Sequence, residues 1–353
     1  MSVNHKSKVA FVGTGIMGAA IAGHILDAGY DLTVYNRTKE KAEALLARGA
    51  HWAQSAGEAA DGADVVFTMV GYPNDVEDVY LSTDGILRRA KKGAWLIDLT
   101  TSSPQLARDI HDAAEVDDKH AFDCPVTGGE KGAVDGTLTL IVGAKQTEVA
   151  PVLPVLETFS SKVFYFDAAG AGQTAKLCNQ VSLASCLMGC ADALALAEQS
   201  GIDRQKVVDL MASGTGRSGA ADTYAPKSLA GDFKPGFMVE HLRKDIALAL
   251  QRAEELEVAL PGSETAFTLF DMLCQIGGSR MGAQAITLLY GEEADATAAG
   301  LDWSLLNTEQ YATGEDDECG CGCGGHGNGE GGCCGGHGHH HGEGGCCHHH
   351  EGN

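Results

Sequence analysis

A glycine-rich turn near the start of the 353-residue chain constrains the fold most. Gly13, Gly15 and Gly18 form the pattern G-x-G-x-x-G directly after the candidate strand Lys8–Val12 and at the start of a helical pattern. The first glycine permits a tight turn, the second lets the backbone approach a pyrophosphate, and the third allows close helix packing. The free N–H groups of the helix then attract phosphates. The motif predicts a dinucleotide site that also includes Ile16 and Met17; the alternative is an ordinary glycine turn without a ligand.

Short apolar runs alternate with helical patterns through the first half of the chain. The candidate strands are Lys8–Val12, Asp31–Tyr35, Asp64–Val70, Trp95–Leu99, Ala121–Cys124, Thr137–Val142 and Phe164–Phe166. This alternation is typical of an α/β fold with a mainly parallel, doubly wound sheet. We therefore expect a Rossmann-type domain over residues 1–167, with the later strands continuing the same sheet.

Strand patterns stop after that domain. The expected helices cover Gly172–Ser200, Arg204–Ser213, His241–Leu256, Gly262–Ile276 and Gly282–Tyr290. We expect an all-helical domain over residues 168–293, a polar connector over 294–314 and a separate tail over 315–353.

The formal net charge of −23 narrows the range of partners. Without a basic patch or a polybasic run, nucleic acids and anionic membranes are not expected to bind. No stretch is expected to have the length and composition of a transmembrane helix. The N-terminus carries no long apolar segment before the first strand, so a cytoplasmic location is the default expectation.

The end of the second strand bears on the choice of cofactor. An NAD site usually has an acid there that binds the ribose 2′-hydroxyl. This chain has Asn36, Arg37 and Thr38 instead. The Arg37 guanidinium can pair with a 2′-phosphate, and the other two side chains can donate further hydrogen bonds. The pattern favours NADP over NAD; alternatively, Arg37 is a solvated loop residue and Thr38 an ordinary helix cap.

The segment GQTAKLCNQ places three polar side chains on one face of a long apolar helix. Lys176, Asn179 and Gln180 stand at positions i, i+3 and i+4. A stripe facing solvent is the ordinary explanation for such a lysine. Reduction of a carbonyl by hydride, however, needs a proton donor for the developing alkoxide, and a partly buried lysine with a lowered pKa suits that role.

Four segments, in order, resemble the β-hydroxyacid dehydrogenase family. They are FVGTGIMG, FDCPVTGGEKGAVDGTLTLIVG, GQTAKLCNQ and FMVEHLRKDIALAL, within about residues 8–290. The resemblance implies a Rossmann domain followed by a helical domain like that of 6-phosphogluconate dehydrogenase. It also implies an NAD(P)-dependent reductase of a small carboxylate-bearing aldehyde, of the 3-hydroxyisobutyrate, succinic semialdehyde, glyoxylate or tartronate semialdehyde class. A homodimer or homotetramer built through the helical domains is expected.

The resemblance also implies roles for individual residues. Lys176 would be the general acid, and no catalytic metal would be needed. The residues expected to contact the substrate are Thr101, Thr127, Gly128, Gly129, Asn179, Gln180, Phe237 and Asp245. Those expected near the nicotinamide are Val70, Gly71, Thr101 and Lys244. The chain departs from the family pattern at Gly71, Thr127 and Gln180, where proline, serine and asparagine are common, which leaves the substrate open.

The tail is a different kind of sequence, rich in glycine, cysteine and histidine. Its candidate ligands are Cys319, Cys321, Cys323, His326, Cys333, Cys334, His337, His339, His340, His341, Cys346, Cys347, His348, His349 and His350. Thiolate and imidazole bind Zn, Ni and Cu, so the tail is predicted to bind transition-metal ions such as Zn or Ni. The alternatives for the tail are a low-complexity extension without a role, or part of an expression tag. For the whole protein, the alternative is a metal-buffering or metal-delivery protein that uses the dehydrogenase body as a scaffold.

Overall fold

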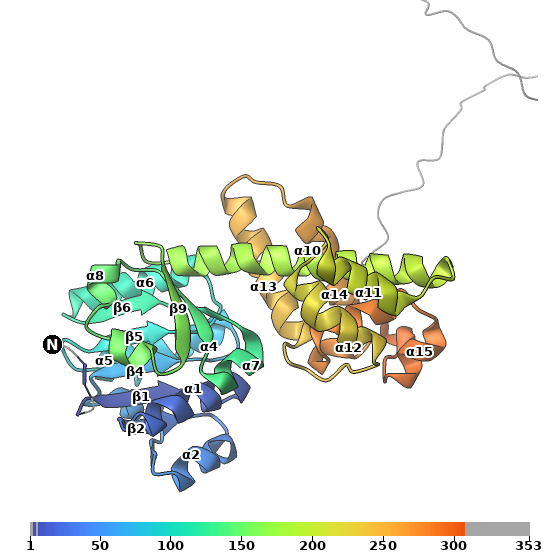
Figure 1. The fold of residues 1–353 in the computed structure, drawn as a ribbon. Helices are drawn as coiled ribbons and strands as arrows, with labels where there is room; N and C mark the ends of the chain where they lie inside the picture. The colour runs from blue at the N-terminus through green and yellow to red at the C-terminus, as the bar shows by residue number, and fades with distance from the viewer. Residues whose placement is uncertain (1–2, 5, 308–353) are drawn as a thin grey trace, which may run out of the picture. The chain divides into compact units, whose positions relative to one another are not determined.

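A parallel sheet and a group of helices make up the part of the chain that the computed structural model describes, residues 3–4 and 6–307. Figure 1 shows the sheet at the N-terminal end, with helices on both of its faces, followed by the helical domain. The predicted metal ligands of the tail and the last part of the predicted connector lie outside the described residues.

Six strands form the first sheet, in the order β3-β2-β1-β4-β5-β6. They are β1 (Lys8–Val12), β2 (Asp31–Tyr35), β3 (His51–Trp52), β4 (Val65–Thr68), β5 (Trp95–Asp98) and β6 (His120–Asp123). All neighbouring strands are parallel. The strand order reverses between β1 and β4, which is where a doubly wound sheet binds its ligand. The predicted Rossmann-type sheet is therefore confirmed.

Apolar side chains cover both faces of this sheet. Phe11 and Phe67 lie in the core on one face, while Ala10 and Val66 lie in the core on the other. Successive residues of a strand point to opposite faces, so a strand buried on both faces is a continuous apolar run. The helices of this region are α1 (Ile16–Asp27), η1 (Lys39–Ala42), α2 (Glu43–Ala47), α3 (Ala56–Ala60), α4 (Pro73–Leu81), α5 (Ile86–Arg89) and α6 (Pro104–Val116).

A second, three-stranded sheet corrects the expectation that the later strands extend the first one. It consists of β7 (Val126–Thr127), β8 (Leu138–Val142) and β9 (Ser160–Tyr165), in the order β7-β8-β9. Gly128 and Gly129 have φ angles of +127° and +63°, which glycine adopts readily. They turn the chain after β7, so that β8 returns antiparallel to β7 and does not pair with β6. Short helices α7 (Gly129–Asp135), α8 (Gln146–Val149) and α9 (Leu153–Leu156) complete this part.

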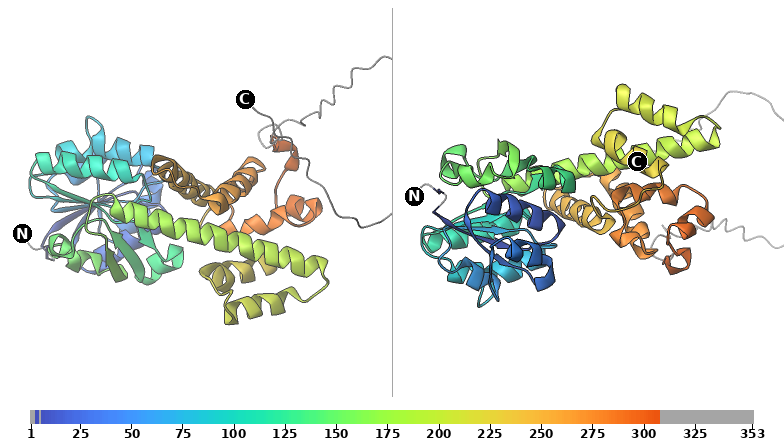
Figure 2. Two further views of the ribbon diagram at one scale, coloured as in Figure 1. Left: turned by 90° about the horizontal axis from the view of Figure 1, so that it is seen from above. Right: turned by 60° about the horizontal axis from the view of Figure 1, so that its bottom comes forward.

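Helix α10 (Ala171–Gln199) runs from the sheet domain into the helical domain, as both views of Figure 2 show. It has 29 residues and a mean hydropathy of 1.5 over its most apolar stretch, enough to span a membrane by length and composition. This corrects the expectation that no such stretch exists. The buried side chains of α10, such as Leu187 and Leu194, pack in one apolar core with Ile246 and Phe270. A core helix passes the same test.

The remaining helices surround the second half of α10. They are α11 (Arg204–Ser213), the π-helical turn η2 (Ala220–Tyr224), α12 (Ala225–Leu229), α13 (Val239–Glu255), α14 (Pro261–Gln275), η3 (Gly278–Arg280), η4 (Ala283–Leu289), α15 (Glu293–Ala298) and η5 (Trp303–Leu305). Helix η4 is a 3₁₀ helix where the sequence suggested an α-helix. Residues 220–229 are helical although no helix was expected there.

The first residues of the predicted connector, 294–307, belong to the helical domain. Ala296 and Leu301 are fully or almost fully buried in the core of the helical domain, and Trp303 packs against that core. Apolar residues at these spacings give α15 and η5 a surface to bury, although Glu293, Asp295 and Asp302 are close by in the sequence. The helical domain therefore extends at least to Asn307, the last described residue.

Candidate active site and nucleotide cradle

The glycine loop has the geometry that the motif predicts. A Cβ atom on Gly13 would lie 2.1 Å from the carbonyl oxygen of Met69, and one on Gly18 would lie 2.0 Å from the carbonyl oxygen of Gly13. Gly15 has no atom within 4 Å of its Cβ position, so this side of the loop is open. No side chain caps the start of α1, and Ile16 is exposed there, next to the half-buried Met17. Free helix N–H groups beside an open glycine fit a pyrophosphate.

Asn36 ties the glycine loop to the end of β2. Its Oδ1 accepts a hydrogen bond from the Thr14 amide at 3.0 Å, and its Nδ2 donates to the Thr38 carbonyl at 2.9 Å. The Thr38 side chain makes no capping hydrogen bond to η1. Arg37 is 80% exposed, and its Nη1 lies 2.9 Å from Oδ1 of Asp75, an acid of α4. The structure thus brings to Arg37 a carboxylate that lies far from it in the sequence.

Lys244, on α13, connects the helical domain to two loops of the sheet domain. Its ammonium donates to the carbonyl oxygens of Thr101, at 2.6 Å, and Gly71, at 3.2 Å. These loops follow β5 and β4, and the Val70 amide donates to the Thr100 hydroxyl between them at 3.0 Å. The predicted nicotinamide residues therefore lie together at the carboxyl ends of neighbouring strands, where open α/β sheets bind ligands.

Lys176 is buried on α10, with 7% of its surface exposed. Burial disfavours the charged ammonium and lowers the pKa of Lys176 to about 8; the carboxylate of Asp245 opposes this shift and the Lys244 ammonium adds to it. A lysine of this pKa holds a proton at neutral pH and releases it readily. It meets the requirement for a general acid in reduction and a general base in the reverse reaction.

A cluster of polar side chains includes the two charged groups that shift the pKa of Lys176, Asp245 and Lys244. The Gln180 amide donates to Asp245 Oδ2 at 2.6 Å, and the Asn179 amide donates to Gln180 Oε1 at 2.9 Å. Asp245 Oδ1 lies 3.2 Å from the Lys244 ammonium and has no aligned hydrogen bond within the described residues. That oxygen retains capacity to accept a hydrogen bond from a bound molecule.

Asn179 lies at the edge of the predicted polar face of α10. Lys176 and Gln180 are buried, whereas Asn179 is exposed. A helix turns by about 100° per residue, so position i+4 lies almost above i while i+3 lies to one side. Asn179 contacts the polar cluster only through its hydrogen bond to Gln180, and it lies on the side of the cluster that faces solvent.

Two residues that the sequence analysis did not select hold the start of α10. The buried Asp123 carboxylate accepts from the amides of Gly170, at 2.7 Å, and Gln173, at 2.6 Å. The Gln173 side chain accepts from the Ser102 amide and donates to the Thr100 carbonyl. Asp123 lies in a predicted strand and in the family-like segment FDCPVTGG, and these are the two signals that could have drawn attention to it. Together these bonds fix the lysine helix against the loop that carries Thr101.

Asp98 lies beneath the same loop. Its Oδ1 accepts from the Thr68 hydroxyl at 2.7 Å and from the Thr100 amide at 3.1 Å. Burial raises the pKa of Asp98 to about 6, against the effect of these hydrogen bonds. Asp98 therefore supports the backbone of the predicted nicotinamide loop.

The other predicted substrate residues lie on separate elements. Thr127 is in β7, and Gly128 and Gly129 form the start of α7, a helix that packs against α1. Phe237 precedes α13 and packs against the core of the helical domain. Their contact with a substrate stays a prediction.

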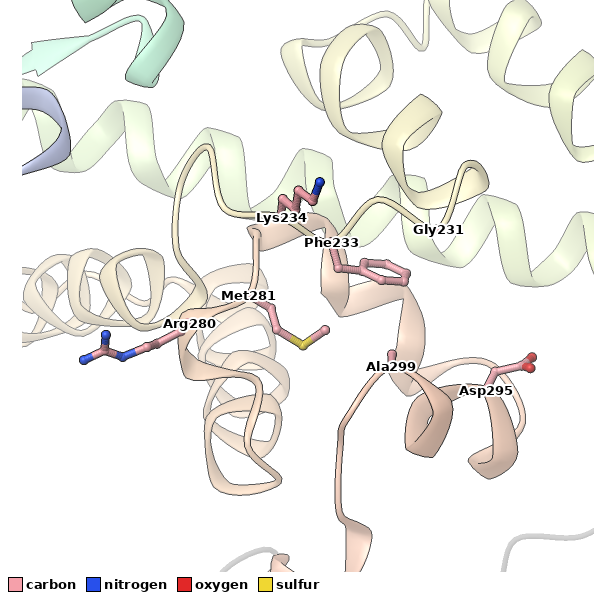
Figure 3. A pocket seen from close by; sticks show the side chains of 7 residues that line it. All are labelled: Gly231, Phe233, Lys234, Arg280, Met281, Asp295 and Ala299. Carbon is pink, nitrogen blue, oxygen red and sulfur yellow. The ribbon is translucent and has the colours of Figure 1, made fainter. Parts of the chain in front are cut away.

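A cavity of about 590 Å³ lies in the helical domain and is lined by none of the candidate active-site residues. Figure 3 shows Phe233 and Met281 at its centre, with Arg280 and Asp295 pointing away to opposite sides. It is lined by Gly231, Phe233, Lys234, Arg280, Met281, Asp295 and Ala299, none of which is a predicted site residue. Its lining gives no reason to move the candidate active site away from Lys176.

Comparison with known proteins matches both domains. The NAD binding domain of 6-phosphogluconate dehydrogenase matches residues 8–167, and a model described as NAD-binding of NADP-dependent 3-hydroxyisobutyrate dehydrogenase matches residues 170–290. The uncharacterized oxidoreductase YkwC of Bacillus subtilis is 41% identical over 81% of this chain and 99% of its own length. The 3-hydroxyisobutyrate dehydrogenase of Pseudomonas aeruginosa is 34% identical over 84% of this chain and 96% of its own length.

A solved structure agrees with these relatives. The 3-hydroxyisobutyrate dehydrogenase of Mycobacterium tuberculosis, solved with L-serine, superposes with a TM-score of 0.75 and 31% identity. The match covers 81% of this chain and 100% of that one. Such identity over nearly the full length of the relatives, together with the glycine cradle and the buried lysine, means that the chain belongs to the β-hydroxyacid dehydrogenase family and is a nicotinamide-dependent oxidoreductase.

Proposed function

We propose that the protein is an NADPH-dependent reductase of a small aldehyde that carries a carboxylate, and that it works in reverse as a 3-hydroxyacid dehydrogenase. The observation that carries this proposal is the buried Lys176 with a pKa of about 8, on a helix that Gln173 ties to the residues on either side of Thr101. The candidate substrates are succinic semialdehyde, glyoxylate, tartronate semialdehyde and the semialdehyde of 3-hydroxyisobutyrate. L-Serine, which is bound in the relative from Mycobacterium tuberculosis, is a further 3-hydroxyacid to test.

Each group of residues has one task in the reaction. The bound nicotinamide supplies the hydride. Lys176 gives the proton from its Nζ to the carbonyl oxygen during reduction and removes it during oxidation. The Thr127 hydroxyl and the amides of Gly128 and Gly129 would hold the substrate carboxylate, since backbone and hydroxyl donors suit a carboxylate. Gln180 and Asp245 would orient the lysine, and Lys244 would close the cleft by binding the Gly71 and Thr101 carbonyls.

A substrate screen tests the reaction class. Purified protein with NADPH is expected to reduce at least one of the four aldehydes, and with NADP⁺ to oxidise the matching 3-hydroxyacid, both followed at 340 nm. Propionaldehyde, which has no carboxylate, is the control and should react at least about tenfold more slowly, since it lacks a charge-assisted contact. Equal rates for propionaldehyde and the acids would contradict the proposed substrate class.

The NADP preference can be tested at Arg37. Replacing Arg37 by Gln is expected to raise the KM for NADPH about tenfold to a hundredfold, because a charge-assisted contact to the 2′-phosphate is lost. The KM for NADH should change little. Lys41→Gln, which removes an exposed positive charge from the neighbouring η1, is the matched control. A wild-type protein that already prefers NADH would contradict the preference.

Metal binding by the tail, a homo-oligomeric assembly and a cytoplasmic location are predictions from the sequence alone. They belong to the same proposal. We expect a cytoplasmic homodimer or homotetramer. A chain ending at Gly314 should keep its reductase activity and lose most of the Zn or Ni that the full chain binds under reducing conditions, because the Cys and His ligands are gone. Metal content by mass spectrometry and NADPH oxidation are measured on both chains. Loss of turnover in the shorter chain would contradict the separation of tail and enzyme.

A further inference from the structure

The arginine expected to bind a 2′-phosphate is already paired. Arg37 Nη1 lies 2.9 Å from Asp75 Oδ1, and the two side chains differ sharply in exposure, at 80% for Arg37 and 16% for Asp75. The arginine therefore extends into solvent at the end of β2, whereas the acid is set into the protein surface. A phosphate that binds Arg37 arrives next to this carboxylate.

The protein backbone holds Asp75 in place. Asp75 is the third residue of α4, and its Oδ2 accepts a hydrogen bond from the Tyr72 amide at 3.1 Å. That oxygen also lies 3.2 Å from the Cβ position of Gly71, so it packs closely on the loop. A negative side chain in the first turn of a helix also interacts favourably with the helix dipole. Of the two partners, Arg37 is the one that can move.

We propose that Asp75 determines how strongly the protein discriminates between NADP and NAD; this inference rests on the proposed cofactor site. A 2′-phosphate must share Arg37 with Asp75 and comes close to a like charge. A plain 2′-hydroxyl brings no charge and can donate a hydrogen bond to a carboxylate. Asp75 thus supplies, from α4, the acid that the end of β2 lacks, and it makes the preference for NADP smaller than Arg37 alone would give.

The test is the affinity of the protein for the oxidised cofactors, measured by isothermal titration calorimetry without substrate. Asp75→Asn removes the charge and keeps an oxygen that can accept from the Tyr72 amide. This variant is expected to bind NADP⁺ and adenosine 2′,5′-bisphosphate about threefold to tenfold more tightly than wild type, the size of an exposed pairing plus a nearby repulsion. Its affinity for NAD⁺ should stay equal or fall.

Two further variants show whether an effect belongs to Asp75: Asp78→Asn is the control for loss of charge, and Arg37→Gln tests the NADP site. Asp78→Asn removes an exposed charge one turn further along α4 and should change neither affinity. Unchanged or weaker NADP⁺ binding by Asp75→Asn overturns the inference, because the acid would then be irrelevant or would position Arg37 for the phosphate. If Arg37→Gln weakens NADP⁺ binding in the same experiment, only the role of Asp75 has failed. If Arg37→Gln has no effect, the proposed NADP site itself has failed.

Discussion

Replacement of Lys176 by Ala is expected to lower turnover by about two to four orders of magnitude, the usual contribution of a general acid. The side chain is buried on α10, and no other lysine or histidine was predicted to give the proton. NADP⁺ affinity should persist, because the glycine loop and Arg37 are untouched. Turnover is measured by NADPH oxidation with the best aldehyde, and affinity by calorimetry.

Two further variants separate proton transfer from a general loss of charge or fold. Lys176→Arg keeps the positive charge but holds its proton at every assay pH, so it should be almost as slow as the alanine variant. Lys206→Ala, which removes an exposed lysine from α11, should retain full activity. A Lys176→Ala enzyme that works within fivefold of wild type would show that another group gives the proton.

Replacement of Asp245 by Asn is expected to shift the pH dependence of both reaction directions toward lower pH. Asp245 raises the pKa of Lys176, which burial and Lys244 lower to about 8. Without the carboxylate this pKa falls further. Reduction needs the protonated lysine, so its rate declines as the pH rises through the pKa, and this decline should begin at lower pH in the variant. Oxidation needs the neutral lysine, so its rise should also begin at lower pH.

The same substitution should destabilise the protein. It leaves two largely buried ammonium groups without their carboxylate, and breaking a buried pair costs about 3–5 kcal/mol. The melting temperature well below pH 8 is the measurement, because Lys176, whose pKa is about 8, then carries its proton. Glu254→Gln, an exposed change on the same helix α13, is the control and should alter neither property. Identical pH profiles for wild type and Asp245→Asn would refute the electrostatic role of Asp245.

The local parts of the fold could be predicted from the sequence. Strands β1 and β2 have the predicted bounds because a short apolar run is a local signal. Gly13 follows the run of β1, and the polar residue Asn36 follows the run of β2. The second sheet could not be predicted, since Thr137–Val142 has the same apolar pattern whether it pairs with β6 or with β7. In the structure the chain turns at Gly128 and Gly129, and β8 pairs with β7 and β9. Ala296 and Leu301 were missed because acidic neighbours hid a short apolar pattern.

The candidate site was predictable where its chemistry lies within one segment. Lys176 and Gln180 stand one helical turn apart, and the helix period brings them together. The partners that control them come from distant parts of the chain. Asp123 contacts Gln173, and Asp75 contacts Arg37, through folds of the chain that no local pattern encodes. The sequence also contains many acids, so no single one could be chosen before the structure placed it.

Helix α10 passes without a break from the sheet domain into the helical domain, so no slack linker separates the two domains. Bending this helix is costly, and tilting it would require Asp123 to release the amides of its first turn. A movement of the helical domain against the sheet domain therefore has to act against α10 itself. It would slide α13 past the loops after β4 and β5 and would first break the bonds of Lys244 to Gly71 and Thr101. The rate at which the cofactor is exchanged would then depend on how fast these two hydrogen bonds of Lys244 break.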